Sequence, residues 1–242
     1  MTPLQSELNR LYLPRSEDHA DAQPTSLIDS RGQVRAMVME LRRPAHWELL
    51  SKVWHGVQSE LELPAPAIAV SGIDALQLWF SLAEPVDGAQ AHAFLERLRL
   101  RFLPEVDAGR VGLMPSSDPS SRPHAAQVPA RQALTENWSA FVASDLAPVF
   151  GDTPWLDIPP SEEGQAGLLR GLRSMQRPEF DAASKRLMPQ AFLLAPTSPT
   201  TSTTPATATQ DPRRFLLQVM NDDSLAMALR IEAAKALLQH PT

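Results

Sequence analysis

The stretch Ile68-Ala-Val-Ser-Gly-Ile-Asp-Ala-Leu-Gln-Leu-Trp-Phe-Ser-Leu82 decides the fold of this chain. Two apolar runs flank a turn at Ser71-Gly72, and the second run alternates between two faces. One face carries Leu76, Leu78, Phe80 and Leu82, and the other carries Gln77, Trp79 and Ser81. A period of two residues is typical of a half-buried strand. The stretch therefore predicts two strands, over residues 67–70 and 75–82, joined by a tight turn.

The flanking sequence extends this unit in both directions. Residues 34–41 are apolar almost throughout, which predicts a strand buried on both faces. Apolar residues recur at helical spacing over 47–61 and again over 91–102, and the second of these helices has Asp87 as its predicted cap. Residues 110–114 predict a fourth, short strand. The order strand, helix, strand, strand, helix, strand is the split βαβ arrangement, so we expect an α+β fold with a ferredoxin-like sheet.

Composition shifts predict four parts in the chain. Residues 1–30 form an N-terminal helix and loop, and residues 31–195 form the α+β domain with a helical extension. Residues 196–210 are almost entirely Thr, Ser, Pro and Ala. Such a segment buries too little apolar area to offset its ordering entropy, so we expect a disordered linker. Residues 211–242 then predict a helical hairpin.

The extension over residues 131–190 is expected to be helical and to cover the open face of the sheet. Its apolar residues from 134 to 150 share one broad face of a helix. Ser161 is the expected cap of a following helix, and Pro178 is expected to start another.

Charge and composition narrow the classes of function. The net charge of −6 argues against a nonspecific nucleic-acid binder with a basic stripe. The chain has no cysteine and no apolar run long enough to span a bilayer, so we expect a cytoplasmic protein without a membrane partner. No two histidines are three or four residues apart, so we expect no metal site and no cofactor.

Two short motifs carry a family resemblance over residues 34–114. The segments Val38-Met-Glu-Leu-Arg42 and Ser71-Gly-Ile-Asp-Ala-Leu-Gln77 resemble, in order and spacing, two motifs of the archaeo-eukaryotic primase-polymerases. In that family an apolar-Asp-apolar-Asp strand and a later Asp hold divalent metals. A Ser-Gly-x-x-x-Leu-His motif places a histidine on the phosphates of the incoming nucleotide. The resemblance implies a primase-like sheet with its ligand site at these two segments.

The departures from the family pattern fall on the reactive positions. Glu40 stands in place of the first aspartate, Arg42 in place of the second, and Gln77 in place of the histidine. Two-metal catalysis needs carboxylates that converge on the ions, whereas an arginine puts a fixed positive charge there. The resemblance thus implies a domain without catalysis. Its relic nucleotide or phosphate site would consist of these three residues together with Ser71, Gly72 and Asp74, although Glu40 and Arg42 would equally suit a salt-bridged strand edge.

Three further residues are candidate nucleic-acid contacts. Arg97 and Arg101 are one helical turn apart and share a face, whereas Arg99 points elsewhere. A solvated surface explains them as well, because aromatic residues are not interleaved with them. Trp79 lies on the polar face of its strand, where it would either stack on a base or pack under the helices that follow residue 130. We expect the packing.

Three hypotheses for function follow. The first is a non-catalytic primase-like protein of a bacterial mobile element that binds single-stranded nucleic acid, a nucleotide or a replication partner. The second is a protein-interaction module acting through the C-terminal hairpin, whose sequence from Asp211 resembles a motif of phage terminase small-subunit-like proteins. The third is an atypical nucleotidyltransferase that uses magnesium with Glu40, Asp74 and Asp118. The oligomeric state stays open.

Overall fold

The computed structural model describes residues 1–14, 26–117 and 124–188. The chain divides into two units, residues 1–194 and 195–242, and every described residue belongs to the first unit. The predicted linker, the predicted hairpin and part of the N-terminal loop lie outside the described residues.

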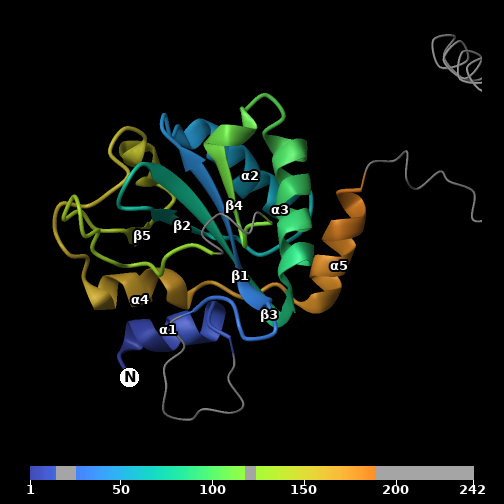
Figure 1. The fold of residues 1–242 in the computed structure, drawn as a ribbon, viewed down its shortest axis with the longest axis horizontal. Coiled ribbons are helices and arrows are strands. Elements are labelled where there is room, and N and C mark those ends of the chain that lie inside the picture. The colour runs from blue at the N-terminus through green and yellow to red at the C-terminus, as the bar shows by residue number, and fades with distance from the viewer. Residues whose placement is uncertain (15–25, 118–123, 189–242) are drawn as a thin grey trace, which may run out of the picture. The chain divides into compact units, whose positions relative to one another are not determined.

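A five-stranded sheet forms the centre of the domain (Figure 1), and every neighbouring pair of its strands is antiparallel. The strands lie side by side in the order β4, β1, β3, β2, β5. Their bounds are β1 Gln33–Arg42, β2 Ala67–Val70, β3 Ala75–Asp87, β4 Val111–Met114 and β5 Ala140–Val142. One helix follows β1 and another follows β3, which is the split βαβ order. The prediction of an α+β fold is confirmed.

Helices cover both faces of this sheet. Their bounds are α1 Pro3–Leu11, α2 Trp47–Ser59, α3 Gly88–Phe102, α4 Glu162–Arg170 and α5 Arg177–Arg186. Helices α2 and α3 pack on one face, whereas α1 and α4 lie together on the other (Figure 1). The expected caps are present, since Asp87 accepts a hydrogen bond at the start of α3 and Ser161 does so at the start of α4. Within the described residues, no helix is long and apolar enough to cross a membrane.

The alternation in β3 sorts its side chains between two cores. Leu76, Leu78 and Phe80 are buried in the core beneath α2 and α3. Trp79 points the other way, into a second core that includes residues of α1 and α4. Successive side chains of a strand point to opposite faces, so the predicted division of this strand is confirmed. Burying one large apolar side chain contributes about 1.5–3 kcal/mol, and two covered faces explain why so little of β3 is polar.

The helix that we predicted over residues 134–150 is wrong. The structure has a turn near Leu134, the strand β5, and a short 3₁₀ helix at Ala147–Phe150. Strand β5 pairs with β2, whose outer edge would otherwise leave backbone groups unpaired. The apolar spacing fits a helix, but Leu134 is 98% exposed and Val149 is 70% exposed, so the predicted stripe is not a buried face.

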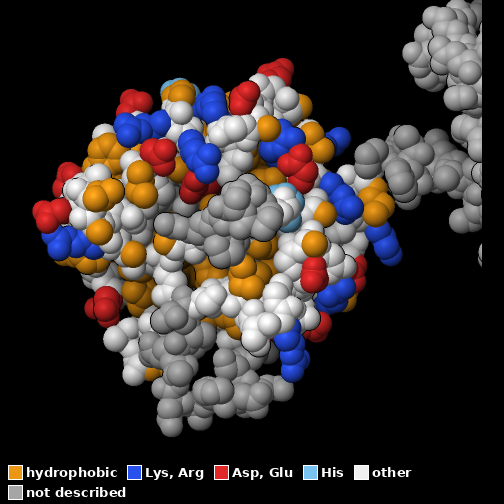
Figure 2. Space-filling view, viewed as in Figure 1, with side chains coloured by type: hydrophobic (Ala, Val, Ile, Leu, Met, Phe, Trp, Pro, Cys, Tyr) orange, Lys and Arg blue, Asp and Glu red, His pale blue; other side chains and the backbone are white. Residues whose placement is uncertain are grey.

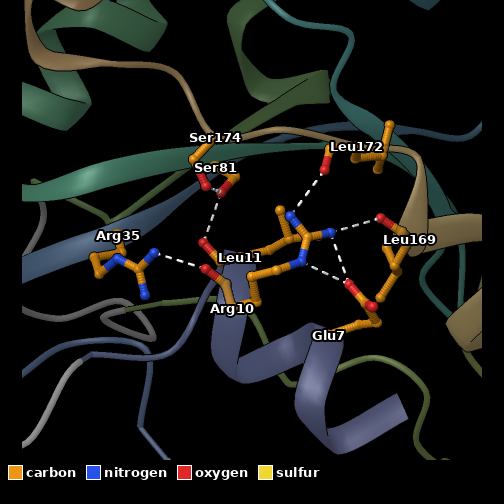
Figure 3. Close-up of polar contacts among 8 residues, drawn as sticks. All are labelled: Glu7, Arg10, Leu11, Arg35, Ser81, Leu169, Leu172 and Ser174. Atoms are coloured by element: carbon orange, nitrogen blue, oxygen red, sulfur yellow. Dashed lines mark hydrogen bonds and ion pairs between the residues drawn. The ribbon is translucent and has the colours of Figure 1, made fainter. Parts of the chain in front are cut away.

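Helix α1 is tied to α4 by an arginine. Arg10 donates to the carbonyl oxygens of Leu169 at 3.0 Å and Leu172 at 2.9 Å, and to the carboxylate of Glu7 at 2.7 Å (Figure 3). The last carbonyls of a helix have no partner within the helix and carry a partial negative charge. The guanidinium therefore caps α4 and holds α1 beside it.

A second arginine, from strand β1, caps α1 in the same way. Arg35 is only 1% exposed, and it donates to the carbonyl oxygens of Asn9, Arg10 and Leu13 at 2.7–3.2 Å. Figure 3 shows the bond to Arg10. A buried charge is costly unless it is hydrogen-bonded, and here the C-terminal carbonyls of α1 supply the acceptors. The N-terminal helix is thus an integral part of the second core.

Candidate functional site

Part of the sheet face that carries α1 and α4 opens into a cleft of about 970 Å³. Strands β1, β3 and β4 contribute its floor, and α3, the turn after β2 and residues 126–128 contribute its walls. Figure 2 shows acidic and basic side chains interspersed on the molecular face in view, with no continuous basic stripe there. The cleft, rather than a charged surface, is the candidate site.

Five of the six residues that the sequence placed in a relic site line this cleft, and Gly72 does not. The lining includes Glu40, Arg42, Ser71, Asp74 and Gln77, which come from two strands and the turn between β2 and β3. Glu40 and Gln77 are direct partners across the β1–β3 pair. Two motifs more than thirty residues apart in the chain thus share one concave surface.

A chain of hydrogen bonds runs from the cleft into the second core. Arg42 Nε donates to Glu40 Oε1 at 3.3 Å, and Gln77 Nε2 donates to Glu40 Oε2 at 2.9 Å. Trp79 Nε1 donates to Gln77 Oε1, also at 2.9 Å. Because an indole N–H can only donate, the tryptophan fixes the amide of Gln77 with its NH₂ group toward Glu40. The glutamate is held in place from both sides.

The turn between β2 and β3 is a closed structure rather than a phosphate cradle. Ser71 Oγ accepts hydrogen bonds from three backbone N–H groups of the turn, at 2.9–3.1 Å. The N–H of Gly72 donates to the carbonyl of Pro154 at 3.0 Å. Gly72 itself has φ +79°, and a Cβ there would lie 2.8 Å from the backbone nitrogen of Ser139. The turn therefore shapes one wall of the cleft, but its N–H groups are already bonded.

Helix α3 contributes a polar face that sequence reasoning missed. His92, Glu96 and Arg99 line the cleft at positions i, i+4 and i+7 of the helix. Arg99 bonds both oxygens of Glu96, at 2.6 and 2.8 Å, and these bonds hold the pKa of Glu96 below its usual value. The helical spacing of these three polar residues was the available signal, since it sets them on the same side of α3.

The other three predicted contacts lie elsewhere. Arg97 and Arg101 do not line the cleft, and Arg101 pairs with Glu60 at 2.9 Å. Trp79 is only 2% exposed, and its ring meets Tyr12 and Phe141 at centroid distances of 5.3 and 5.8 Å. Trp79 is therefore too buried to stack on a base, and it packs against the end of α1 as well as against the segment after residue 130.

The carboxylates at the cleft do not form a metal-binding set. In β4, Gly112 is the direct partner of Glu40 and Met114 that of Val38, so the two β4 positions that share this face of the sheet carry no carboxylate. Across the three ranges that the structure describes, no group of three His, Cys, Asp or Glu side chains could hold a metal ion. Of the atypical catalytic set, Glu40 and Asp74 line the cleft, and Asp118 lies outside the described residues.

No protein family model matches this chain, and no curated protein sequence matches it. Function is therefore inferred from the cleft. Its lining includes guanidinium groups at Arg42 and Arg99, carboxylates at Glu40, Asp74 and Glu96, and the amide group of Gln132. Amides both donate and accept hydrogen bonds, and guanidinium groups bind carboxylate or phosphate. Such a mixed surface suits a polar small molecule, or one unit of a polymer, that has an anionic group for a guanidinium to bind.

Proposed function

We propose that the cleft binds a nucleotide, either free or as one unit of a single strand, and that the domain catalyses no reaction on it. The protein would be a non-catalytic primase-like protein acting in the replication or maintenance of a bacterial mobile element. The observation that supports this most directly is the meeting of Glu40, Arg42, Asp74 and Gln77 in one cleft. Both motifs of the family resemblance contribute to that group.

The dimensions and chemistry of the cleft suit such a ligand. Sites for small molecules and cofactors enclose about 300–1,000 Å³, and this cleft measures about 970 Å³. Gln132, whose Nε2 donates to the carbonyl of Ser71 at 3.2 Å, can accept a hydrogen bond from the edge of a base through its amide oxygen, and Arg42 is able to bond a phosphate.

The proposal of a domain without catalysis rests on the charges around Glu40. A two-metal mechanism requires several carboxylates around a pair of ions about 4 Å apart. Here Glu40 is bonded by Arg42 and Gln77, and its neighbour on β4 is Gly112. A divalent cation beside Glu40 would meet the positive guanidinium rather than a second carboxylate.

The test uses two labelled probes, an oligothymidylate and a fluorescent nucleoside triphosphate, each titrated with full-length protein at several salt concentrations. We expect micromolar binding that weakens as salt rises, because phosphate contacts release counterions. Binding of both probes would indicate recognition of a nucleotide unit, whereas binding of the oligonucleotide alone would indicate a site for the strand. Pyrophosphate release should stay at background.

A variant that fills the cleft provides the control. Gly112→Leu adds a side chain next to Glu40, where a Cβ alone would lie 3.3 Å from the glutamate. Gly167→Leu makes the same chemical change on α4, where nothing lies within 4 Å. We expect the first variant to abolish binding and the second to retain it, with both folded by circular dichroism. Equal binding by the two variants would place the ligand outside the cleft.

A further inference from the structure

Two arginines line the cleft among the residues that the structure describes, and they are held very differently. Arg99 has a side chain only 13% exposed and binds Glu96 through two bonds of 2.6 and 2.8 Å. Such a bidentate pair is among the stronger polar contacts in proteins. Arg99 would have to give up both bonds to reach a ligand, so it serves mainly to hold the wall.

Arg42, in contrast, is held loosely. Its side chain is 51% exposed. It donates to Glu40 Oε1 and to the carbonyl of Gly109, each at 3.3 Å, which is beyond the usual range of a strong charged hydrogen bond. An exposed pair of this kind contributes little stability. Arg42 can therefore change partners at small cost, and it already lies at the lining of the cleft.

Glu40 lies beside it as a fixed negative charge. Its side chain is 13% exposed, and Gln77 holds its other oxygen at 2.9 Å. Space remains next to the pair, because both residues line the cleft of about 970 Å³ and Gly112, the partner of Glu40 on β4, carries no side chain. An incoming anion thus has room beside the guanidinium, and Glu40 is the group that it must displace.

We propose that Arg42 is the phosphate-binding group of the cleft, with Glu40 as its built-in counter-ion, so that the cleft binds a nucleotide phosphate without a divalent cation. This inference rests on the proposed function. The phosphate takes the place of Glu40 as partner of the guanidinium, and no covalent bond changes. The carboxylate of Glu40 repels the phosphate and therefore weakens its binding. In a metal-dependent site, in contrast, the carboxylate would hold the metal and would be essential for binding.

The experiment is calorimetric titration of full-length protein with a nucleoside triphosphate, in magnesium and in excess EDTA. The dissociation constant should agree within about twofold between the two conditions, since the charge that meets the phosphate belongs to the protein. Arg42→Ala should weaken binding at least about tenfold, the loss expected for one charge-assisted hydrogen bond. Glu40→Gln should strengthen binding about threefold or more by removing a like charge.

Arg43→Ala is the matched control. It removes the same charge from the next residue, but Arg43 does not line the cleft, and its guanidinium lies 5.4 Å from the ring centre of Trp155. We expect this variant to bind as the wild type does, and thermal unfolding should show that all three variants are folded.

The outcomes separate this inference from the proposed function. Binding that is lost in EDTA, or lost in Glu40→Gln, would overturn the metal-independent role of Arg42 and leave nucleotide binding in place. If Arg42→Ala and Arg43→Ala bound the nucleotide with equal affinity, the role of Arg42 would also be overturned, and nucleotide binding would stay in place. A wild-type protein that binds no nucleotide in either buffer would overturn both.

Discussion

Protonation of His124 should destabilise the domain, and its surroundings set the size of the effect. The side chain is 6% exposed, and burial lowers its pKa from 6.5 to about 4. The N–H of Ala125 donates to Nδ1 at 2.8 Å, so Nδ1 is the unprotonated nitrogen and Nε2–H donates to the carbonyl of Ala36 at 3.0 Å. A proton added to Nδ1 would face that backbone N–H and would have no acceptor there.

The sign and size of the effect follow from the two pKa values. Between pH 6.5 and about 4 the unfolded chain binds the proton and the folded chain does not, so stability falls as pH falls through this window. Each pKa unit of difference contributes about 1.4 kcal/mol, which gives about 3 kcal/mol for His124. That is a large share of the 5–15 kcal/mol by which domains are usually stable, so the effect is measurable.

The assay is urea unfolding at a series of pH values, comparing the wild type with His124→Gln. A glutamine amide can still donate to the carbonyl of Ala36 but does not titrate. The free energy of unfolding of the wild type should fall by about 3 kcal/mol more than that of the variant between pH 7 and pH 4. His55→Gln, at an exposed position on α2, controls for the loss of a histidine. Two parallel pH profiles for wild type and His124→Gln would refute the reasoning.

Three further predictions concern packing and burial. Arg35→Met should lower the free energy of unfolding, measured in urea, by about 3 kcal/mol or more, because it leaves the carbonyls at the end of α1 without their donor. The control Arg31→Met, at an exposed position, should have little effect. Equal losses in the two variants would contradict the capping role of Arg35. Burial raises the pKa of Tyr12, the only tyrosine, so phenolate absorbance should appear only as the protein unfolds in alkali. Phenolate absorbance at a pH where circular dichroism shows the protein still folded would contradict this. Gly56→Ala should lower the melting temperature by several degrees, because its Cβ would clash with the ring of Phe102 between α2 and α3; an unchanged melting temperature would mean that the ring moves aside freely.

The sequence predicted best where local periodicity and tertiary burial agree. In the run from Leu76 to Leu82, a period of two matched a strand with different cores on its two faces. The helix of residues 91–102 was predicted for the same reason, since its apolar stripe is the face that packs on the sheet.

The predictions failed where the local structure depends on residues that are distant in the sequence. The segment around Phe141 has helical spacing, but it forms a strand because its backbone pairs with the edge of β2. No local pattern near residue 141 indicates that the edge of β2 needs a partner strand. In the same way, the arginine caps at Arg10 and Arg35 depend on carbonyl groups of other elements, which no local pattern reveals.

The site was predicted to the extent that short motifs carried it. Glu40 and Gln77 were expected in one site and are direct partners across two strands. The contribution of α3 was missed because only its arginines were weighed, as a nucleic-acid surface, and attention went to Arg97 and Arg101 instead of Arg99. Which side of a helix overlooks a cleft depends on the rotation of the helix on the sheet, and that is set by tertiary packing.

The docking of α1 has a consequence for the order of events during synthesis. This helix is made long before the segment that it is tied to, and Arg10 reaches the carbonyls of Leu169 and Leu172 only when those residues, about 160 positions later, have also emerged. Closing so long a loop is slow compared with local folding. Until then only the sheet can hold α1, as in the contact of Tyr12 with Trp79, and the part of the second core that Ala166 and Leu169 cover stays open. A segment that is made early is thus among the last to gain its full set of partners.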